Sequence, residues 1–224
     1  MITRIGAAAR RSHMSIGGFQ THWKEQHGPT AGAIPDLKRY VQHHAVVVDG
    51  RSILPYPGFD ACSELDFESI DAMDEGFRLA AESGELKVDE DRFVDKEKYS
   101  WLLGETEVRF ERPGAPPNDP ITLVTWWRSH PASNRDRLVE VLTGEWERSL
   151  DDGTAVTRRT LAVARDDLHQ GRGAPTADVV EIITFDGLDV VQGFIGGHMQ
   201  EHGPMFAGIA FGVERHVARV VVII

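Results

Sequence analysis

The alternation of apolar and polar positions divides the first half of the chain into strands and helices. Four segments are rich in β-branched residues or alternate at period two, as strands do; they are residues 2–9, 39–48, 59–67 and 99–110. Two segments repeat apolar side chains at steps of three or four, as amphipathic helices do; they are residues 16–26, which Ser15 is suited to cap, and 69–81. The pattern therefore predicts the order β-α-β-β-α-β, the ferredoxin-like arrangement.

A proline-rich segment separates this unit from a second one. Residues 111–120 contain four prolines and one glycine, which cannot continue a helix or a central strand. We interpret residues 113–120 as a linker between a unit at 1–112 and a unit at 121–224. The second unit repeats the order, with strands at 121–127, 154–164, 179–185 and 215–224 and helices at 135–150 and 188–196.

The repeated order predicts how the two units pack. Each unit carries its helices on one face of an antiparallel sheet, so the other face stays uncovered unless a second sheet covers it. We therefore expect an α+β fold in which two tandem ferredoxin-like βαββαβ units form an intramolecular, pseudo-dimeric α/β barrel. The two sheets would meet inside and the helices would lie outside.

Composition narrows the range of partners. The chain has 224 residues, 41% of them hydrophobic, and 35 acidic against 24 basic side chains give a net charge of −11. A nucleic-acid partner is therefore not expected, because phosphates would be repelled. The single cysteine, Cys62, fits a reducing compartment, and we expect the cytoplasm. The apolar runs 5–9 and 220–224 are too short for a signal peptide core or a membrane span, so no membrane role is expected.

Two motifs in the first unit carry a family resemblance. Phe19, Trp23 and His27 follow one another at steps of four, and Tyr40-Val41-Gln42-His43-His44 lies in the second strand. With residues 59–67 and 92–95, these motifs resemble the EthD family of dimeric α/β-barrel proteins over residues 1 to about 111. The second unit lacks the Phe-x-x-x-Trp-x-x-x-His spacing and shares only the element order.

The resemblance implies a small-molecule enzyme without settling the reaction. The family includes lactone isomerases, decarboxylases or dehydratases of aromatic intermediates, and members of unknown role. Such proteins usually work without a metal or organic cofactor, so none is expected here. Single-repeat members dimerise to complete the barrel, whereas this chain carries both halves; a further homo-oligomer is possible.

The second strand supplies the candidate acid or base. Alternation places Tyr40, Gln42 and His44 on one face, and His43 on the other. If the apolar set faces the helices, His44 looks into the space between the sheets, where an imidazole can exchange protons at neutral pH. His44 also matches the histidine of the family pattern, but His43 stands where asparagine is common, which leaves open which histidine lines the pocket. A purely structural histidine is the alternative.

The third strand could supply a carboxylate partner. Asp60, Cys62 and Glu64 share one face, and burial with mutual repulsion would raise one carboxyl pKa if that face is turned inward; a solvated acidic face is the alternative. Cys62 is expected to be a buried filler. The catalytic candidates are His44, His27, His22, Glu64 and Asp60, and the substrate-binding candidates are Tyr40, Gln42, Trp23, His43, Trp127 and Arg128.

Two further patterns were weighed. Arg158 and Arg159 fall on opposite faces of their strand, and one of them could bind a substrate carboxylate with two hydrogen bonds, although a surface salt bridge is the commoner outcome. His198-Met199-Gln200-Glu201-His202 reads formally as an inverted zincin motif. Glycines and a proline flank it and no suitable third ligand follows, so we expect no metal site.

These features favour a cofactor-independent isomerase or lyase that moves protons on a small cyclic or aromatic metabolite, as in lactone isomerisation, dehydration or decarboxylation. No dinucleotide fingerprint and no phosphate-binding loop is present. The main alternative is a non-catalytic ligand-binding or accessory protein of a catabolic pathway. A haem or other imported cofactor held through a histidine is a third possibility.

Overall fold

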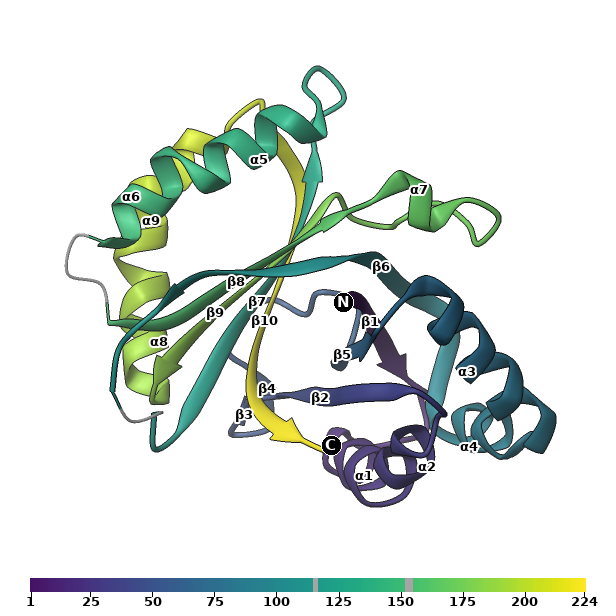
Figure 1. Ribbon diagram of the computed structural model, residues 1–224. Helices are drawn as coiled ribbons and strands as arrows, with labels where there is room; N and C mark the ends of the chain where they lie inside the picture. Colours follow the sequence, from purple (N-terminus) through teal and green to yellow (C-terminus); the bar gives the residue numbers. More distant parts are fainter. Residues whose placement is uncertain (115–116, 152–154) are drawn as a thin grey trace.

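Eight strands close into one antiparallel barrel (Figure 1). The computed structural model describes residues 1–114, 117–151 and 155–224. Around the barrel the strands follow the order β1-β5-β2-β10-β7-β9-β8-β6. The strands are β1 (Ile2–Arg10), β2 (Leu37–Ala45), β5 (Ala61–Phe67), β6 (Val94–Glu111), β7 (Pro120–Ser129), β8 (Val156–Ala164), β9 (Val179–Asp186) and β10 (Ala210–Val222).

Each half of the barrel has the strand order of a ferredoxin-like sheet. The N-terminal half runs β6-β1-β5-β2 and the C-terminal half runs β10-β7-β9-β8. Two seams join the halves, β2 with β10 and β6 with β8, through registers such as His43 opposite Val220 and Gly104 opposite Ala164. The predicted α+β barrel is confirmed. The division at residues 113–120 stays an interpretation; residues 115–116 of that linker, and Thr154 at the start of one predicted strand, lie outside the described residues.

Helices cover both outer faces of the barrel, one group on each side (Figure 1). The N-terminal half carries α1 (Ile16–His22), a π-helical turn η1 (Trp23–His27), α2 (Gly28–Gly32), α3 (Ile70–Ser83) and α4 (Glu85–Phe93). The C-terminal half carries α5 (Arg135–Thr143), α6 (Glu145–Asp151), α7 (Asp166–His169), α8 (Leu188–Gly196), α9 (His198–His202) and a 3₁₀ turn η2 (Gly203–Phe206). A small hairpin of β3 (Val47–Val48) and β4 (Arg51–Ser52) completes the described elements. No helix among the described residues is long and apolar enough to cross a membrane.

The first helical segment is longer than its sequence pattern predicts. Ser15 caps it as expected, accepting a hydrogen bond from the Gly18 N–H. Instead of ending near Gln26, the backbone passes through η1 and continues to Gly32. Pro29 has no N–H to donate, and the Gly28 N–H bonds back to the Trp23 carbonyl in the wider π pattern. The proline is thus accommodated without ending the helix.

Side chains fill one part of the barrel interior and leave another part open. An apolar cluster contributed by both halves includes Ile5, Cys62, Leu102, Trp126 and Val180. As the alternation of β7 predicts, Trp126 points inward, whereas Trp127 packs outside among the helices of the C-terminal half. The open part lies where β7 and β8 begin and β9 and β10 end, and it forms the cavity described next.

Candidate functional site

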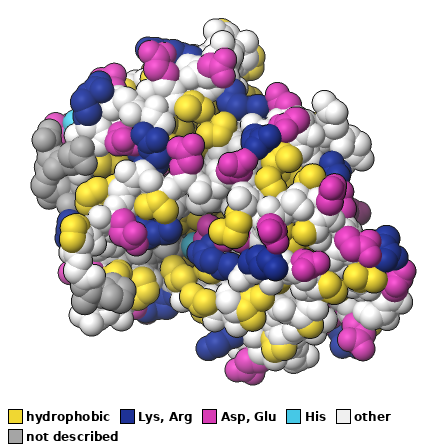
Figure 2. All heavy atoms as spheres, viewed as in Figure 1, with side chains coloured by type: hydrophobic (Ala, Val, Ile, Leu, Met, Phe, Trp, Pro, Cys, Tyr) yellow, Lys and Arg dark blue, Asp and Glu magenta, His cyan; other side chains and the backbone are white. Residues whose placement is uncertain are grey.

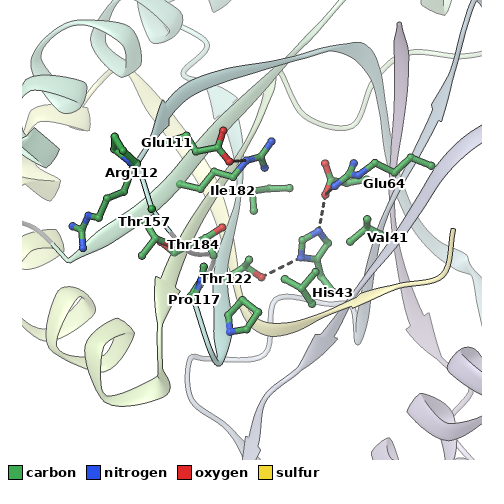
Figure 3. Close-up of a pocket in the computed structure, with 16 residues that line it drawn as sticks. Val41, His43, Glu64, Glu111, Arg112, Pro117, Thr122, Thr157, Ile182 and Thr184 are labelled. Carbon is green, nitrogen blue, oxygen red and sulfur yellow. Dashed lines mark hydrogen bonds and ion pairs between the residues drawn. The ribbon is translucent and has the colours of Figure 1, made fainter.

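A cavity of about 610 Å³ lies inside the barrel between the two sheets. Figure 2 shows the face of the molecule hollowed near its centre, with basic side chains beside the hollow. The polar residues that line the cavity are Arg39, His43, Glu64, Glu111, Arg112, Thr122, Thr157, Arg158 and Thr184. Apolar lining comes from Val41, Ile182 and Val220. Figure 3 shows that these side chains come from both halves and converge on one space.

His43 is held between a carboxylate and a hydroxyl (Figure 3). Its Nε2 lies 2.9 Å from Glu64 Oε1, and its Nδ1 lies 3.1 Å from Thr122 Oγ1. The carboxylate can only accept, so Nε2 carries a hydrogen and donates it to Glu64. This arrangement fixes both the tautomer and the direction of the ring, as a base that must hold a substrate proton requires.

Glu64 stays ionised although it is buried. Burial alone would raise its pKa, but the hydrogen bond from His43, the positive charge of that imidazole and the guanidinium of Arg39 lower the pKa to about 2. Arg39 Nη2 lies 3.5 Å from Glu64 Oε1, and Arg39 Nη1 donates to Asp66 Oδ2 at 3.2 Å. The predicted carboxylate beside a histidine is therefore present, with the opposite sign of pKa shift from the one expected, because cations rather than a second carboxylate lie beside Glu64.

The Thr122 hydroxyl can serve both protonation states of His43. It can direct its hydrogen to His43 Nδ1, or to the Ala218 carbonyl 3.3 Å away. In the second state the Nδ1 lone pair is available for a proton from the cavity, and the protonated ring can then donate to Thr122 Oγ1. Thr122 is itself buried, so its hydroxyl has few alternative partners.

The expectation that His44 faces the space between the sheets is wrong. His44 points to the helix layer, where its ring stacks on Trp23 with centroids 4.5 Å apart and its Nε2 bonds Gln42 Oε1 at 2.7 Å. Burial, followed by repulsion from Lys24, lowers its pKa to about 4. Tyr40, Gln42 and Trp23 belong to the same layer, because Gln42 donates to the Trp23 carbonyl and to the Tyr40 hydroxyl. These four residues satisfy one another outside the barrel.

His22 and His27 also lie in that helix layer. Both contact one carboxylate of α4, His22 Nε2 at 2.7 Å from Asp89 Oδ1 and His27 Nδ1 at 2.9 Å from Asp89 Oδ2. Burial is the main cause that lowers the His27 pKa, against the effect of Asp89. A second, small cavity of about 70 Å³ adjoins His27 on this side of the sheet. Neither histidine lines the large cavity.

The remaining candidates lie away from the cavity as well. Asp60 is buried and receives hydrogen bonds from the Arg10 guanidinium, the Arg10 N–H and the Tyr56 hydroxyl. Trp127 donates to Glu181 at 3.1 Å in the outer layer of the C-terminal half. Arg128 donates to the Thr176 carbonyl and pairs with Glu214. Of the residues expected at the site, only His43 and Glu64 line the large cavity.

Sequence reasoning did not nominate Arg39, Thr122 or Arg158 as a group. The signal for the first was present, because Arg39 shares the parity of Val41 and His43 along β2. Thr122 lies on β7, two strands away from β2 in the barrel, and no local pattern connects the two residues. Its proximity to His43 becomes visible only once the barrel is closed.

The histidines on α9 do not form a metal site. The rings of His198 and His202 lie 4.4 Å apart, and His198 Nε2 contacts the Ser149 hydroxyl at 3.1 Å. Among the described residues, no group of three or more His, Cys, Asp or Glu side chains is arranged to hold a metal ion. A haem in the large cavity would need a free imidazole nitrogen as its axial ligand. His43, the histidine among the described lining residues, uses both nitrogens, so this cavity does not fit a haem.

Comparison with known proteins confirms the family resemblance in the N-terminal half. Residues 11–97 match the family model of the EthD domain. No curated protein matches the chain.

Solved structures share the fold at low sequence identity. The chain is similar to an anthrone oxidase-like protein, with 14% identity, 98% of this chain and 91% of that chain covered, and a TM-score of 0.64. It is also similar to a provisionally named monooxygenase from Fusobacterium nucleatum subsp. nucleatum, with 9% identity, 99% and 93% covered, and a TM-score of 0.58. A mutant chlorite dismutase from Candidatus Nitrospira defluvii follows, with 10% identity, 97% and 90% covered, and a TM-score of 0.50. These likenesses show the α/β barrel fold.

Proposed function

We propose, taking residues 11–97 as an EthD domain, that this chain is an enzyme that moves protons on a small cyclic or aromatic metabolite. The observation that carries the proposal is the Glu64–His43–Thr122 array in the wall of a cavity of about 610 Å³. The reaction class is isomerisation, or elimination by a lyase, with His43 as the base and acid. No organic cofactor or metal is part of the proposed step.

The step requires one proton to leave a carbon and to return elsewhere. His43 Nδ1 takes the proton from a carbon next to a carbonyl, and the electron pair of the C–H bond moves into an enolate. The imidazolium then returns that proton to a second carbon, which completes an isomerisation, or to a departing oxygen, which completes an elimination. Ionised Glu64 favours the imidazolium in between, because it lies 2.9 Å from Nε2.

Exchange of carbon-bound hydrogen for deuterium tests this function without knowledge of the natural substrate. Unsaturated lactones, cyclic ketones and hydroxylated aromatic ketones would be incubated with the protein in D₂O and followed by proton NMR. We expect catalysed loss of a C–H signal in at least one class. Binding without any exchange across the panel would instead favour a ligand-binding protein.

Neighbouring histidines on opposite faces of β2 provide a matched pair of variants. His43→Gln should lower the exchange rate by about 10²-fold to 10⁴-fold, the usual contribution of a positioned acid or base. His44→Gln, which alters only the outer helix layer, should keep the rate within a few fold of wild type. Circular dichroism checks that both variants fold. Equal rates in wild type and His43→Gln, or loss of exchange in His44→Gln alone, would contradict the assignment of His43.

A further inference from the structure

The cavity is more basic than the chain around it. Three arginines, Arg39, Arg112 and Arg158, line it against two glutamates, Glu64 and Glu111, whereas the whole chain carries a net charge of −11. Glu64 is already engaged with His43 and Arg39. A concave site with an excess of fixed positive charge concentrates anions, even in an acidic protein.

Arg158 lies across the cavity from His43. Strand β8, which carries Arg158, is four steps from β2 in the ring of eight strands, so the two strands stand on opposite sides of the barrel. An eight-stranded barrel is wide enough inside to hold one small ligand. A ligand in contact with His43 at one end can therefore reach Arg158 at the other.

Arg158 is held only loosely by its protein partner. Its Nε lies 3.5 Å from Glu111 Oε1, directly opposite on β6, and the two side chains are 37% and 66% exposed. An ion pair this exposed contributes little, so a ligand carboxylate can compete with Glu111. The next residue, Arg159, shows the contrast: it faces outward, is 1% exposed, and is tied to Glu181 and Glu147 at 2.7 Å each.

We infer that the substrate of this site carries a carboxylate, which Arg158 binds through two parallel hydrogen bonds of its planar guanidinium. The inference deepens the proposed function by naming the substrate class. The hydrocarbon body of the ligand would lie against Val41, Ile182 and Val220, which are the apolar part of the lining. The carboxylate thus anchors the molecule at β8 and leaves its reacting carbon near His43.

Calorimetric titration with acids and their neutral amides tests the inference. The probes are benzoate, cinnamate and cyclohexenecarboxylate, each paired with its amide, in low-salt buffer. We expect wild type to bind at least one acid about tenfold more tightly than its amide, since a charged hydrogen-bonded pair discriminates by that much or more. Arg158→Gln should remove this preference, and Arg158→Lys should keep part of it. Arg78→Gln, on the exposed face of α3, is the matched control and should bind like wild type.

The outcomes separate this inference from the proposed function. Equal affinity for acid and amide in wild type, or an unchanged preference in Arg158→Gln, would overturn it. Because the first comparison uses wild type alone, it decides the matter even if a variant fails to fold. His43→Gln should bind the acids normally while losing exchange. Acid binding through Arg158 without exchange in wild type would refute the proton-transfer function and leave the ligand assignment standing.

Discussion

Glu64 shows how a single buried charge can be kept in this barrel. Only 4% of the residue is exposed, yet a histidine on one side and an arginine on the other replace the water it has lost. A buried carboxylate with such partners is expensive to break, because removal of one member leaves the others buried without compensation. The same contacts that orient His43 therefore also stabilise the fold.

Replacement of Glu64 by glutamine should destabilise the protein in a pH-dependent way. At pH 7, Glu64→Gln should lower the free energy of unfolding by roughly 3 kcal/mol, as expected when a buried ion pair loses one partner. The folded-state pKa of Glu64, about 2, lies below the ordinary value of 4.5, so its contribution is present above pH 4.5 and is lost as the pH falls toward 2. Urea unfolding of both proteins between pH 7 and pH 3 measures this. A difference that does not shrink below pH 4.5 would contradict the account.

The two adjacent histidines of β2 define what could be predicted at the residue scale. Alternation correctly separated His43 from His44, and the family pattern added weight to His44. Polarity then favoured the wrong face, since a strand with Tyr40, Gln42 and His44 on one side looks suited to a wet cavity. The helix layer instead supplies partners for that whole set, including the Trp23 carbonyl and ring. Such partners come from a separate element, and the strand pattern contains no information about them.

At the scale of elements, α4 has the most consequence of the helices that the sequence pattern missed. Its residues are mostly charged, so the apolar repeat that marks a helix is weak over residues 85–93. Once formed, α4 places Asp89 under η1, where it bridges His22 and His27. The strands and the longer helices were predicted because their burial imposes a period, whereas α4 depends on polar contacts made after the chain has folded back.

The bridge formed by Asp89 should be structural and separable from catalysis. Asp89→Asn leaves one of the two histidines facing an amide N–H instead of an acceptor, which should cost about 1–3 kcal/mol of unfolding free energy. Urea denaturation measures the loss. Asp91→Asn, an exposed change on the same helix, should leave the midpoint close to wild type. Deuterium exchange should be unchanged in both, because neither residue lines the large cavity; a loss of exchange in folded Asp89→Asn would place the chemistry in the helix layer instead.

At the scale of the molecule, two sheets that each lack a cover on one face predicted the barrel, and its closed order of strands confirms that reasoning. The cavity could not be predicted in the same way. Whether a barrel interior is filled depends on the side chains that meet from both halves, such as Trp126 with Cys62 in the filled part and His43 with Thr122 in the open part. Those meetings are set by the register of the two seams, which no local pattern encodes.

The β6 and β8 seam should therefore control both the stability and the ligand site. A Cβ atom on Gly104 would lie 2.3 Å from the Val163 carbonyl oxygen, so Gly104→Ala must push the two backbones apart. We expect a loss of about 2 kcal/mol and a fall in melting temperature of roughly 5 °C. Gly193→Ala, on α8 with no atom within 4 Å of the new Cβ, should be neutral or slightly stabilising and serves as the matched control. Glu111 and Arg158 face each other across the same seam, so opening it should also weaken binding of the acid probes. Hydrogen exchange of the β6 and β8 amides, measured with calorimetric titration, would show both effects; unchanged amide protection in Gly104→Ala would mean that the seam does not depend on this close approach.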